Sequence, residues 1–260
     1  MNYRVVKIKK NKNGLYEVNL DKKELLLYEE IVLKYDLLIK KDISDYFVKK
    51  MIQENKEVDA YQKSLDYLKR QKKTEYEVKS YLKEQDFSLE IIEVVLERLR
   101  KLKLVDDYDY AKRYIHYMVS YRLTGPRKIR QCLLKRGIKE DISNSILKKY
   151  DDEVWYEKIR KQIVSKRQRD IRKSDALFRQ NIVNELIYNG YPKVYVTEVL
   201  KDMDTNQDKE AIENELAYLY KKYQTKYSGY ELSFRIKRRL SEEGFLYSDI
   251  KEAMQKFLEE

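Results

Sequence analysis

The stretch IRQCLLKRGI, residues 129–138, contains a leucine that is followed four residues later by glycine and then by an apolar residue. The same layout recurs in VKSYLKEQDF (78–87), IVNELIYNGY (182–191) and RIKRRLSEEGF (235–245). The aligned leucines are 51, 53 and 54 residues apart, at Leu82, Leu133, Leu186 and Leu240. Glycine just past a helix adopts the left-handed conformation without a Cβ penalty, and the next apolar residue packs back on the last turn. The pattern therefore predicts four copies of a helix that end in the same way.

The copies extend into a longer repeat. Three of them stop at Gly137, Gly190 or Gly244, whereas the first has Asp86, a weaker terminator. An apolar-periodic segment follows each stop, and a longer helical segment precedes each leucine after a turn. A three-helix repeat of about 50 residues buries only a small core, which stacking on neighbouring repeats would supplement. We therefore expect a mainly α protein, an elongated tandem array of three-helix repeats.

The expected domains follow from this spacing. Residues 1–59 form an N-terminal β-hairpin region with helices, and the four repeats occupy 60–105, 106–150, 151–203 and 204–260. The hairpin is predicted because YRVVKIKK and GLYEVNL alternate on either side of NKNG. ELLLYEEIVLKYDL is expected to add a short strand and then a helix. A further helix is expected to start near Asp42 or Ser44 and to run into the first repeat.

Composition excludes several classes of function. The chain has 260 residues, 39% of them charged, with two prolines, one cysteine and one histidine. No apolar run is long enough to span a membrane and the first residues lack a signal-peptide core, so we expect a cytoplasmic protein that does not contact membranes. Cys132 fits a helix core, His116 has no metal-ligand partner, and neither GxxxxGK[ST] nor GxGxxG occurs. We therefore expect no cofactor, no metal and no catalytic residues, which favours a binding protein.

Positive charge is concentrated in the middle of the chain. The net charge is +11, of which +6 falls in residues 106–150, whereas residues 204–260 carry −2. From Lys112 to Lys139 there are nine Lys or Arg and no Asp or Glu, and from Lys158 to Lys173 there are eight against Asp170 alone. Such runs attract acidic partners, most often nucleic acid. The 25 tyrosines could stack on unpaired bases, but at helical spacing they are more often packed within the protein.

Some residues in this region are expected to be structural. Gly125 and Pro126 lie between the first two helices of the second repeat, with the proline at a plausible first helical position. Asp106 and Asp107 are expected to cap the helix that follows them. The helix stops Gly137, Gly190 and Gly244 belong to the same structural group.

The second repeat and its entry resemble the RecX family of bacterial recombinase regulators. The family has an L-x-x-x-x-[IVL]-D-D-x-x-[FY]-A stretch. Here Val105, Asp106, Asp107, Tyr110 and Ala111 match its second half, and Leu99 lies one residue further upstream than the pattern places its leucine. It also has G-x-x-x-[IL]-x-x-x-L-x-x-x-G-[IV], which here is Gly125, Ile129, Leu133, Gly137 and Ile138. In the preceding segment Thr74 is expected to cap a helix, with Glu77 at the capping-box position. The resemblance is specific over residues 60–150, and the hairpin region and fourth repeat go beyond the family's shorter members.

The resemblance implies a non-enzymatic protein that binds the RecA recombinase and RecA–DNA filaments. Family members reduce the filament's ATPase, strand-exchange and repressor co-cleavage activities in DNA repair and recombination. We expect a monomer when free, with weak binding to single- or double-stranded DNA. The residues expected to contact the partner or nucleic acid are the basic ones of the two runs: Arg113, Arg122, Arg127, Lys128, Arg130, Lys135, Arg136, Lys166, Arg167, Arg169, Arg172 and Lys173.

Two alternatives remain open from the residues. A direct DNA-binding protein is one, because helix-turn-helix proteins use basic second helices. Against it, IVNELIYN carries no positive charge while RIKRRL carries four, although repeated DNA-reading helices should be more alike. The other is a protein-interaction scaffold that involves no nucleic acid.

Overall fold

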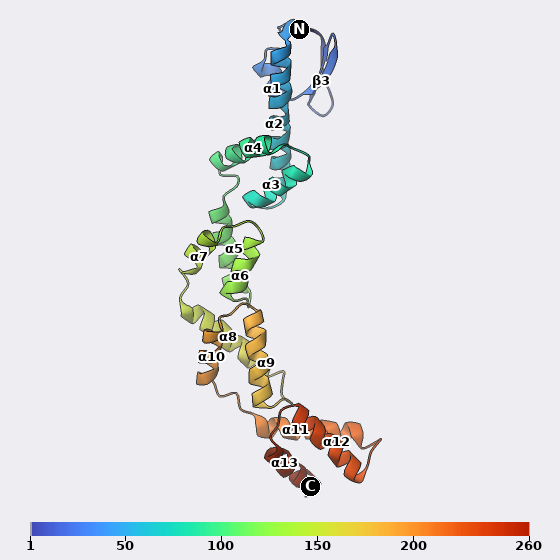
Figure 1. Cartoon of the computed structure of the whole chain (residues 1–260), viewed down its shortest axis with the longest axis vertical. Coiled ribbons are helices and arrows are strands. Elements are labelled where there is room, and N and C mark those ends of the chain that lie inside the picture. The colour runs from blue at the N-terminus through green and yellow to red at the C-terminus, as the bar shows by residue number, and fades with distance from the viewer. Residues whose placement is uncertain (1, 260) are drawn as a thin grey trace. The chain divides into compact units, whose positions relative to one another are not determined.

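A computed structural model describes residues 2–259, which form a small N-terminal β-sheet followed by helices (Figure 1). The sheet is antiparallel, in the order β3-β2-β1-β4. Its strands are β1 (Asn2–Lys10), β2 (Tyr16–Leu20), β3 (Lys23–Leu27) and β4 (Asp42–Ser44). The predicted hairpin around NKNG and the strand within ELLLYEE are therefore confirmed. The sequence did not indicate β4, which pairs with the first residues of β1.

The turn between β1 and β2 is closed by its own polar groups. The side-chain oxygen of Asn11 accepts hydrogen bonds from the backbone N–H groups of Asn13 and Leu15, both at 3.0 Å. The Asn11 N–H donates to the Leu15 carbonyl at 2.8 Å. Gly14 has φ +81°, in the left-handed region, and a Cβ there would meet no atom within 4 Å. The local sequence is thus sufficient to form this turn.

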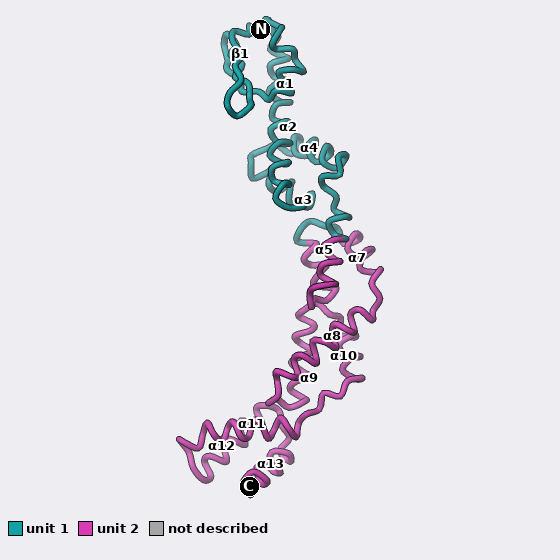
Figure 2. The backbone as a smooth tube through the Cα atoms, turned by 180° about the vertical axis from the view of Figure 1, so that it is seen from behind, with its two compact units in different colours: residues 1–112, 135–139 teal, residues 113–134, 140–260 magenta. Residues whose placement is uncertain are grey.

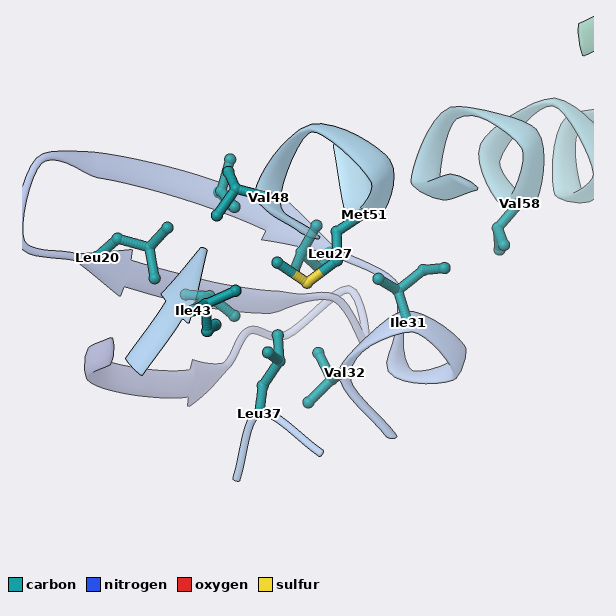
Figure 3. Packing of buried hydrophobic residues seen from close by; sticks show 11 residues of the cluster. Leu20, Leu27, Ile31, Val32, Leu37, Ile43, Val48, Met51 and Val58 are labelled. Atoms are coloured by element: carbon teal, nitrogen blue, oxygen red, sulfur yellow. The ribbon is translucent and has the colours of Figure 1, made fainter. Parts of the chain in front are cut away.

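One face of the sheet is buried against two helices, α1 (Glu29–Lys34) and the beginning of α2 (Asp45–Arg70). Figure 3 shows Met51 of α2 and Leu27 of β3 pointing toward one another in this core, with Val32 of α1 beside them. Met51 and Val32 have no exposed surface. The expected helix is confirmed, since Ser44 is the N-cap of α2 and the helix continues unbroken past residue 60.

The remaining helices described by the structure have the lengths and order expected of helical triplets. α2 continues into the first triplet with α3 (Glu75–Glu84) and α4 (Leu89–Lys101). The later helices are α5 (Asp107–Tyr121), α6 (Pro126–Leu134), α7 (Glu140–Leu147), α8 (Asp152–Arg167), α9 (Asp175–Tyr188), α10 (Lys193–Asp202), α11 (Asp208–Tyr223), α12 (Gly229–Glu242) and α13 (Tyr247–Glu259). The mainly α fold with a small N-terminal sheet is confirmed. The five segment boundaries and the elongated arrangement stay predictions.

The helices belong to two compact units, which Figure 2 colours separately. Unit 1 holds the residues up to Lys112 together with Lys135–Lys139, and unit 2 holds Arg113–Leu134 with the residues from Glu140 onward. Within unit 1, Leu82 of α3 lies in a core with residues of α2 and α4. Within unit 2, Leu240 of α12 lies in an equivalent core with residues of α11 and α13. Both aligned leucines have no exposed surface.

The four helix ends have the backbone conformation that the sequence predicted. Gly137, Gly190 and Gly244 have φ values of +78°, +91° and +84°, and Asp86 has φ +60° in the same role. In three of the copies the residue after the stop donates its N–H to the carbonyl of the aligned leucine: Phe87 to Leu82 at 3.3 Å, Tyr191 to Leu186 at 3.0 Å, and Phe245 to Leu240 at 3.3 Å. This bond satisfies a carbonyl that the helix leaves without a partner.

These helix ends also meet the beginnings of other second helices. In unit 2 the Gly125 N–H donates to the Asn189 carbonyl at 2.8 Å, and the Arg127 N–H donates to the Gly190 carbonyl at 3.0 Å. Free N–H groups at the start of α6 are thereby paired with free carbonyls at the end of α9. The contact is so close that a Cβ on Gly125 would lie 2.3 Å from the Gly190 backbone carbon.

The same junction recurs twice. In unit 2 the Ser174 N–H, at the start of α9, donates to the Glu243 carbonyl at the end of α12 at 3.3 Å. In unit 1 the Thr74 hydroxyl, at the start of α3, donates to the Arg136 carbonyl at 2.7 Å. Thr74 also forms the predicted capping box with Glu77, which is confirmed. Hydrogen bonds between residues distant in the sequence thus form these junctions, between backbone groups in unit 2 and from the Thr74 side chain in unit 1.

Candidate partner-binding surface

α6 carries its basic residues on the side away from its buried residues. Ile129 and Leu133 have no exposed surface, whereas Arg127 is exposed and Lys128 and Arg130 are half-buried. The helical period explains this division, because Ile129 and Leu133 are one turn apart on the face that packs inward. The start of α6 is held by the junction with α9, so the backbone under Arg127 and Lys128 is fixed.

The three cations of α6 have different surroundings. The Lys128 amine lies 4.7 Å from the centroid of the Tyr188 ring. The Arg130 Nη1 donates to the Asn144 side-chain oxygen at 3.0 Å. Among the residues that the structure describes, no carboxylate pairs with Arg127. None of the three cations is neutralised by an ion pair within that part of the chain, so this face keeps its positive charge for a partner.

A shallow hollow of ≈ 320 Å³ lies beside the segment that leads into α6, within unit 2. It is lined by Tyr121, Arg122 and Leu123 and, from α8, by Glu157, Lys158 and Lys161, and the Lys161 amine lies 3.8 Å from the Glu157 carboxylate. The Lys158 amine donates to the Arg122 carbonyl at 2.6 Å, and burial lowers the pKa of this amine. Tyr121 and Leu123 are 74% and 54% exposed. The hollow therefore combines apolar contact surface with charged residues that are mostly basic, Arg122, Lys158 and Lys161 against Glu157. Interfaces likewise have an apolar centre and a polar rim.

Arg113 and Lys135 are exposed, Arg113 on α5 in unit 2 and Lys135 in unit 1. Arg136 in unit 1 already has partners within the fold. Its Nη1 lies 2.7 Å from Glu77 Oε1 and donates to the Tyr110 hydroxyl at 2.8 Å. Its carbonyl accepts the hydrogen bond of Thr74. Arg136 therefore links parts of the fold. The Glu77 carboxylate pairs with the positive charge that we expected to face a partner.

Arg167 requires a correction, because its side chain is buried with 5% exposure. Its Nη1 donates to the carbonyls of Lys173 at 3.0 Å and Asp170 at 3.4 Å, and the guanidinium lies 4.9 Å from the centroid of the Phe178 ring. Arg167 thus holds the loop between α8 and α9 from the inside. The expectation that it contacts a partner is wrong, because the residue faces the core on the same stripe as Ile163.

The other basic residues around that loop are mostly paired. Lys166 lies 3.0 Å from Glu185, Lys173 lies 3.3 Å from Asp170, and Arg172 lies 3.4 Å from Glu215. Burial raises the pKa of Glu215, which shows that its environment disfavours the ionised carboxylate. Arg169 is exposed, with its Nε bonded to the Ser165 carbonyl. The run 158–173 therefore offers less free charge than its sequence suggests.

The acidic pair before α5 serves two different contacts. The Asp106 carboxylate accepts the Asp109 N–H at 2.9 Å, which is a helix-capping bond. The Asp107 carboxylate accepts the Glu75 N–H at the start of α3, also at 2.9 Å, and burial raises the pKa of Asp107. In unit 2 the Asp208 carboxylate accepts the Asp175 N–H in the same way at 2.6 Å. Pro126, at the corresponding place in the second repeat, has no N–H to donate.

Several functional features were not found from the sequence. The role of Lys158 as a cap on the Arg122 carbonyl is one, and the exposed aromatic residues of α12 are another. Cys132 is half-buried instead of fully in a core. Within residues 2–259 no group of three or more His, Cys, Asp or Glu is placed to hold a metal ion. In the same range no helix combines the length and the apolar character needed to cross a membrane.

The comparisons with known proteins point to one family. A family model described as RecX, first three-helix domain, matches residues 60–99, and one described as RecX, second three-helix domain, matches residues 106–146. A protein named regulatory protein RecX from Lactococcus lactis subsp. cremoris is 28% identical over 267 aligned positions, covering 98% of both chains. Another of that name from Limosilactobacillus reuteri is 27% identical, covering 92% of both.

Solved structures agree with these matches. A crystal structure of regulatory protein RecX superposes with a TM-score of 0.66 at 28% identity, covering 77% of this chain and 100% of the other. A crystal structure of RecX from Lactobacillus salivarius has a TM-score of 0.54 at 25% identity, covering 56% of this chain and 95% of the other. The likeness thus covers the sequence, the three-helix domains and the folded chain.

Proposed function

Since this chain belongs to the RecX family, we propose that it regulates the RecA recombinase by binding RecA and RecA–DNA filaments. The proposed outcome is a decrease in the filament's ATPase, strand-exchange and co-protease activities during DNA repair and recombination. The chain acts as a monomer in the cytoplasm and contributes binding energy alone, with no chemistry of its own.

The observation that carries the proposal is the unpaired positive charge on α6, beside the basic and apolar hollow. Arg127, Lys128 and Arg130 lie on a helix whose start is fixed by the junction with α9. A preorganised cationic face loses little conformational entropy when it meets an acidic protein surface or phosphates. This region lies in the repeat matched by the second family model.

Inhibition requires a difference in affinity between states of the filament. A ligand that binds every state of the ATPase cycle equally shifts none of them. Charge alone gives weak binding to DNA, of order 10⁻⁴ to 10⁻⁶ M near physiological salt. The additional selectivity comes from apolar and hydrogen-bonded contacts with RecA, for which the hollow supplies Tyr121 and Leu123.

The test is a titration of the protein into preformed RecA–DNA filaments, with the DNA-dependent ATPase as readout. The variant replaces Arg127, Lys128 and Arg130 by alanine, which keeps the Cβ atoms packed at the junction. We expect weaker inhibition, and a salt dependence whose slope falls by about one for each phosphate that the variant no longer binds. Circular dichroism should show unchanged helicity.

The matched control replaces Lys12, Lys22 and Lys23, exposed residues of the two N-terminal turns and the start of β3, by alanine. It removes the same charge, so it should inhibit like the wild type if the position of the charge matters. Equal losses in both variants would reject α6 as the contact surface. If the wild type binds naked DNA as tightly as filaments, direct DNA binding replaces regulation of RecA as the function.

A further inference from the structure

α12 presents a stripe of aromatic and cationic residues on the face away from its core. Ile236 and Leu240 are buried, while Tyr230 and Phe234 are 87% and 53% exposed. The two exposed rings are one helical turn apart and nearly parallel, with centroids separated by 6.4 Å and an angle of 19° between their planes. Folding buries neither ring, so packing does not account for them.

The stripe forms one side of a groove of ≈ 660 Å³ within unit 2. Beyond the two rings, the lining consists of Ser233, Lys237, Arg238, Ser241 and Glu242 of α12 and Tyr247 of α13. Tyr247 is 69% exposed. No aliphatic side chain contributes to the lining that the structure describes. A groove for an amphipathic helix would need such side chains, because its anchors are apolar.

Cations follow the rings along the same stripe. Among residues 2–259 no carboxylate pairs with Lys237. Arg238 lies 3.2 Å from Glu242, but that carboxylate also accepts from Arg239 at 2.8 Å. Arg239 also lies 3.0 Å from Glu243, so Glu242 is left to pair with Arg238. The positive charge that remains on the lining of the groove is that of Lys237, although residues 204–260 carry −2 overall.

We propose that this groove binds single-stranded nucleic acid, with bases stacked on the rings and phosphates near Lys237 and Arg238. Exposed ring faces bind unpaired bases of any sequence, whereas the bases of a duplex are stacked on one another. From Tyr230 to Ser241 the stripe extends about 16 Å at 1.5 Å per residue, which is enough for about four or five stacked nucleotides at 3.4 Å each.

The site is separate from the surface assigned to RecA, and it does not require that assignment to be correct. It lies on α12, whereas that surface comprises α6 and the adjoining hollow. Binding of free strands in the absence of RecA is therefore the appropriate measurement. If free strands do not bind, the proposed regulation of RecA is unaffected.

The experiment measures fluorescence anisotropy of a labelled 15-nucleotide oligothymidylate titrated with the full chain. The double variant Tyr230→Ala with Phe234→Ala should bind at least about 25-fold more weakly, because each stacked ring contributes about fivefold or more. Tyr46→Ala, which removes a comparably exposed ring from α2, should bind like the wild type. Circular dichroism should give the same helicity for all three proteins.

Salt dependence separates stacking from general charge attraction. Two phosphate contacts predict a slope of about −1.4 for log K against log salt, since each contributes about −0.7 on a single strand. Lys237→Gln should reduce that slope by about half. A steeper slope that disappears in the Arg127, Lys128 and Arg130 variant would place strand binding on α6 and overturn the proposal.

Competition distinguishes the possible occupants. An unlabelled single strand should displace the probe, and a blunt duplex or a poly-glutamate peptide should do so at least tenfold less well. Equal displacement by the peptide would identify the groove as a site for acidic protein segments. Equal displacement by the duplex, or wild-type affinity in the double ring variant, would likewise refute single-strand stacking here.

Discussion

Replacing Gly190 by alanine should break the junction between α9 and α6. At φ +91° an alanine is in the left-handed region, which costs roughly 1–2 kcal/mol for a residue with a Cβ. The new Cβ would also lie 2.5 Å from the Lys128 backbone nitrogen, so the two helix ends must separate. Separation leaves the N–H groups of Gly125 and Arg127 without their carbonyl partners, at about 1–3 kcal/mol each if they stay buried. We expect the free energy of unfolding to fall by about 3–8 kcal/mol in total.

Gly14→Ala is the matched control for that substitution. Gly14 also has a left-handed φ, +81°, but its Cβ would meet no atom within 4 Å. It should therefore lose only the backbone cost of roughly 1–2 kcal/mol. The difference between the two variants isolates the junction from the conformational preference of glycine.

The assay is urea unfolding followed by two probes. The chain has one tryptophan, Trp155, which is buried in α8 of unit 2 and reports on that unit. Circular dichroism reports on all helices, so separate transitions would show that the chain does not unfold as one cooperative unit. Gly190→Ala should move the tryptophan transition to lower urea, and Gly14→Ala should leave it in place. Equal shifts in both variants, or an unmoved tryptophan transition in Gly190→Ala, would refute the junction as a source of stability.

Leu133→Ala, which empties a fully buried position, should lower the free energy of unfolding by about 2–5 kcal/mol, whereas the exposed Leu134→Ala should change it by less than about 0.5 kcal/mol in the same urea assay. Asp107→Ala should cost about 1–3 kcal/mol by leaving the Glu75 N–H unpaired, measured by thermal melting. Asp107→Asn keeps an acceptor. Burial raises the pKa of Asp107 in the folded state, so the free energy of unfolding of the wild type falls as pH rises through that pKa. Asparagine does not titrate. The stability of Asp107→Asn relative to the wild type should therefore increase from about pH 4 upward. Arg167→Met should release the carbonyls of Asp170 and Lys173, and hydrogen exchange at 168–173 should become at least about tenfold faster; unchanged exchange there would show that Arg167 does not hold the loop.

The helix ends were predictable because their chemistry is local. A left-handed residue after the last turn and an apolar residue behind it are both visible in ten residues of sequence. Even Asp86, which is not glycine, has the left-handed φ of +60° that its place in the pattern implied. The hairpin turn around Gly14 and the capping box of Thr74 and Glu77 were predictable for the same reason.

The junctions in unit 2 were not predictable, because backbone groups make them. The Gly125 N–H and the Asn189 carbonyl are 64 residues apart, and neither bond depends on which side chain those residues carry. β4 was missed for a similar reason, since its three residues pair with β1 from about 40 residues away. The spacing of the motif predicts where each helix ends. Which distant residues that helix end contacts depends on how the chain folds.

Arg167 was a different kind of error, since the sequence contained the information that corrects it. Counting charge along residues 158–173 treated every lysine and arginine as exposed. The helical period places Arg167 four residues after Ile163 and eight after Ile159, on the stripe that the structure shows to be buried. Charge should therefore be counted by helix face, because the face and not the run determines what a partner can reach.

Junctions built from backbone groups leave the outward faces of the second helices free to diverge. α6 carries unpaired cations, and α12 carries exposed rings with cations behind them, yet both keep two buried apolar residues one turn apart. The acidic balance of residues 204–260 is thus compatible with a binding site on that repeat, because the groove draws on one face of one helix. It follows that function in this chain is best assigned helix face by helix face, and that exchanging the outward residues of α6 and α12 should exchange their ligands while both junction and core stay intact.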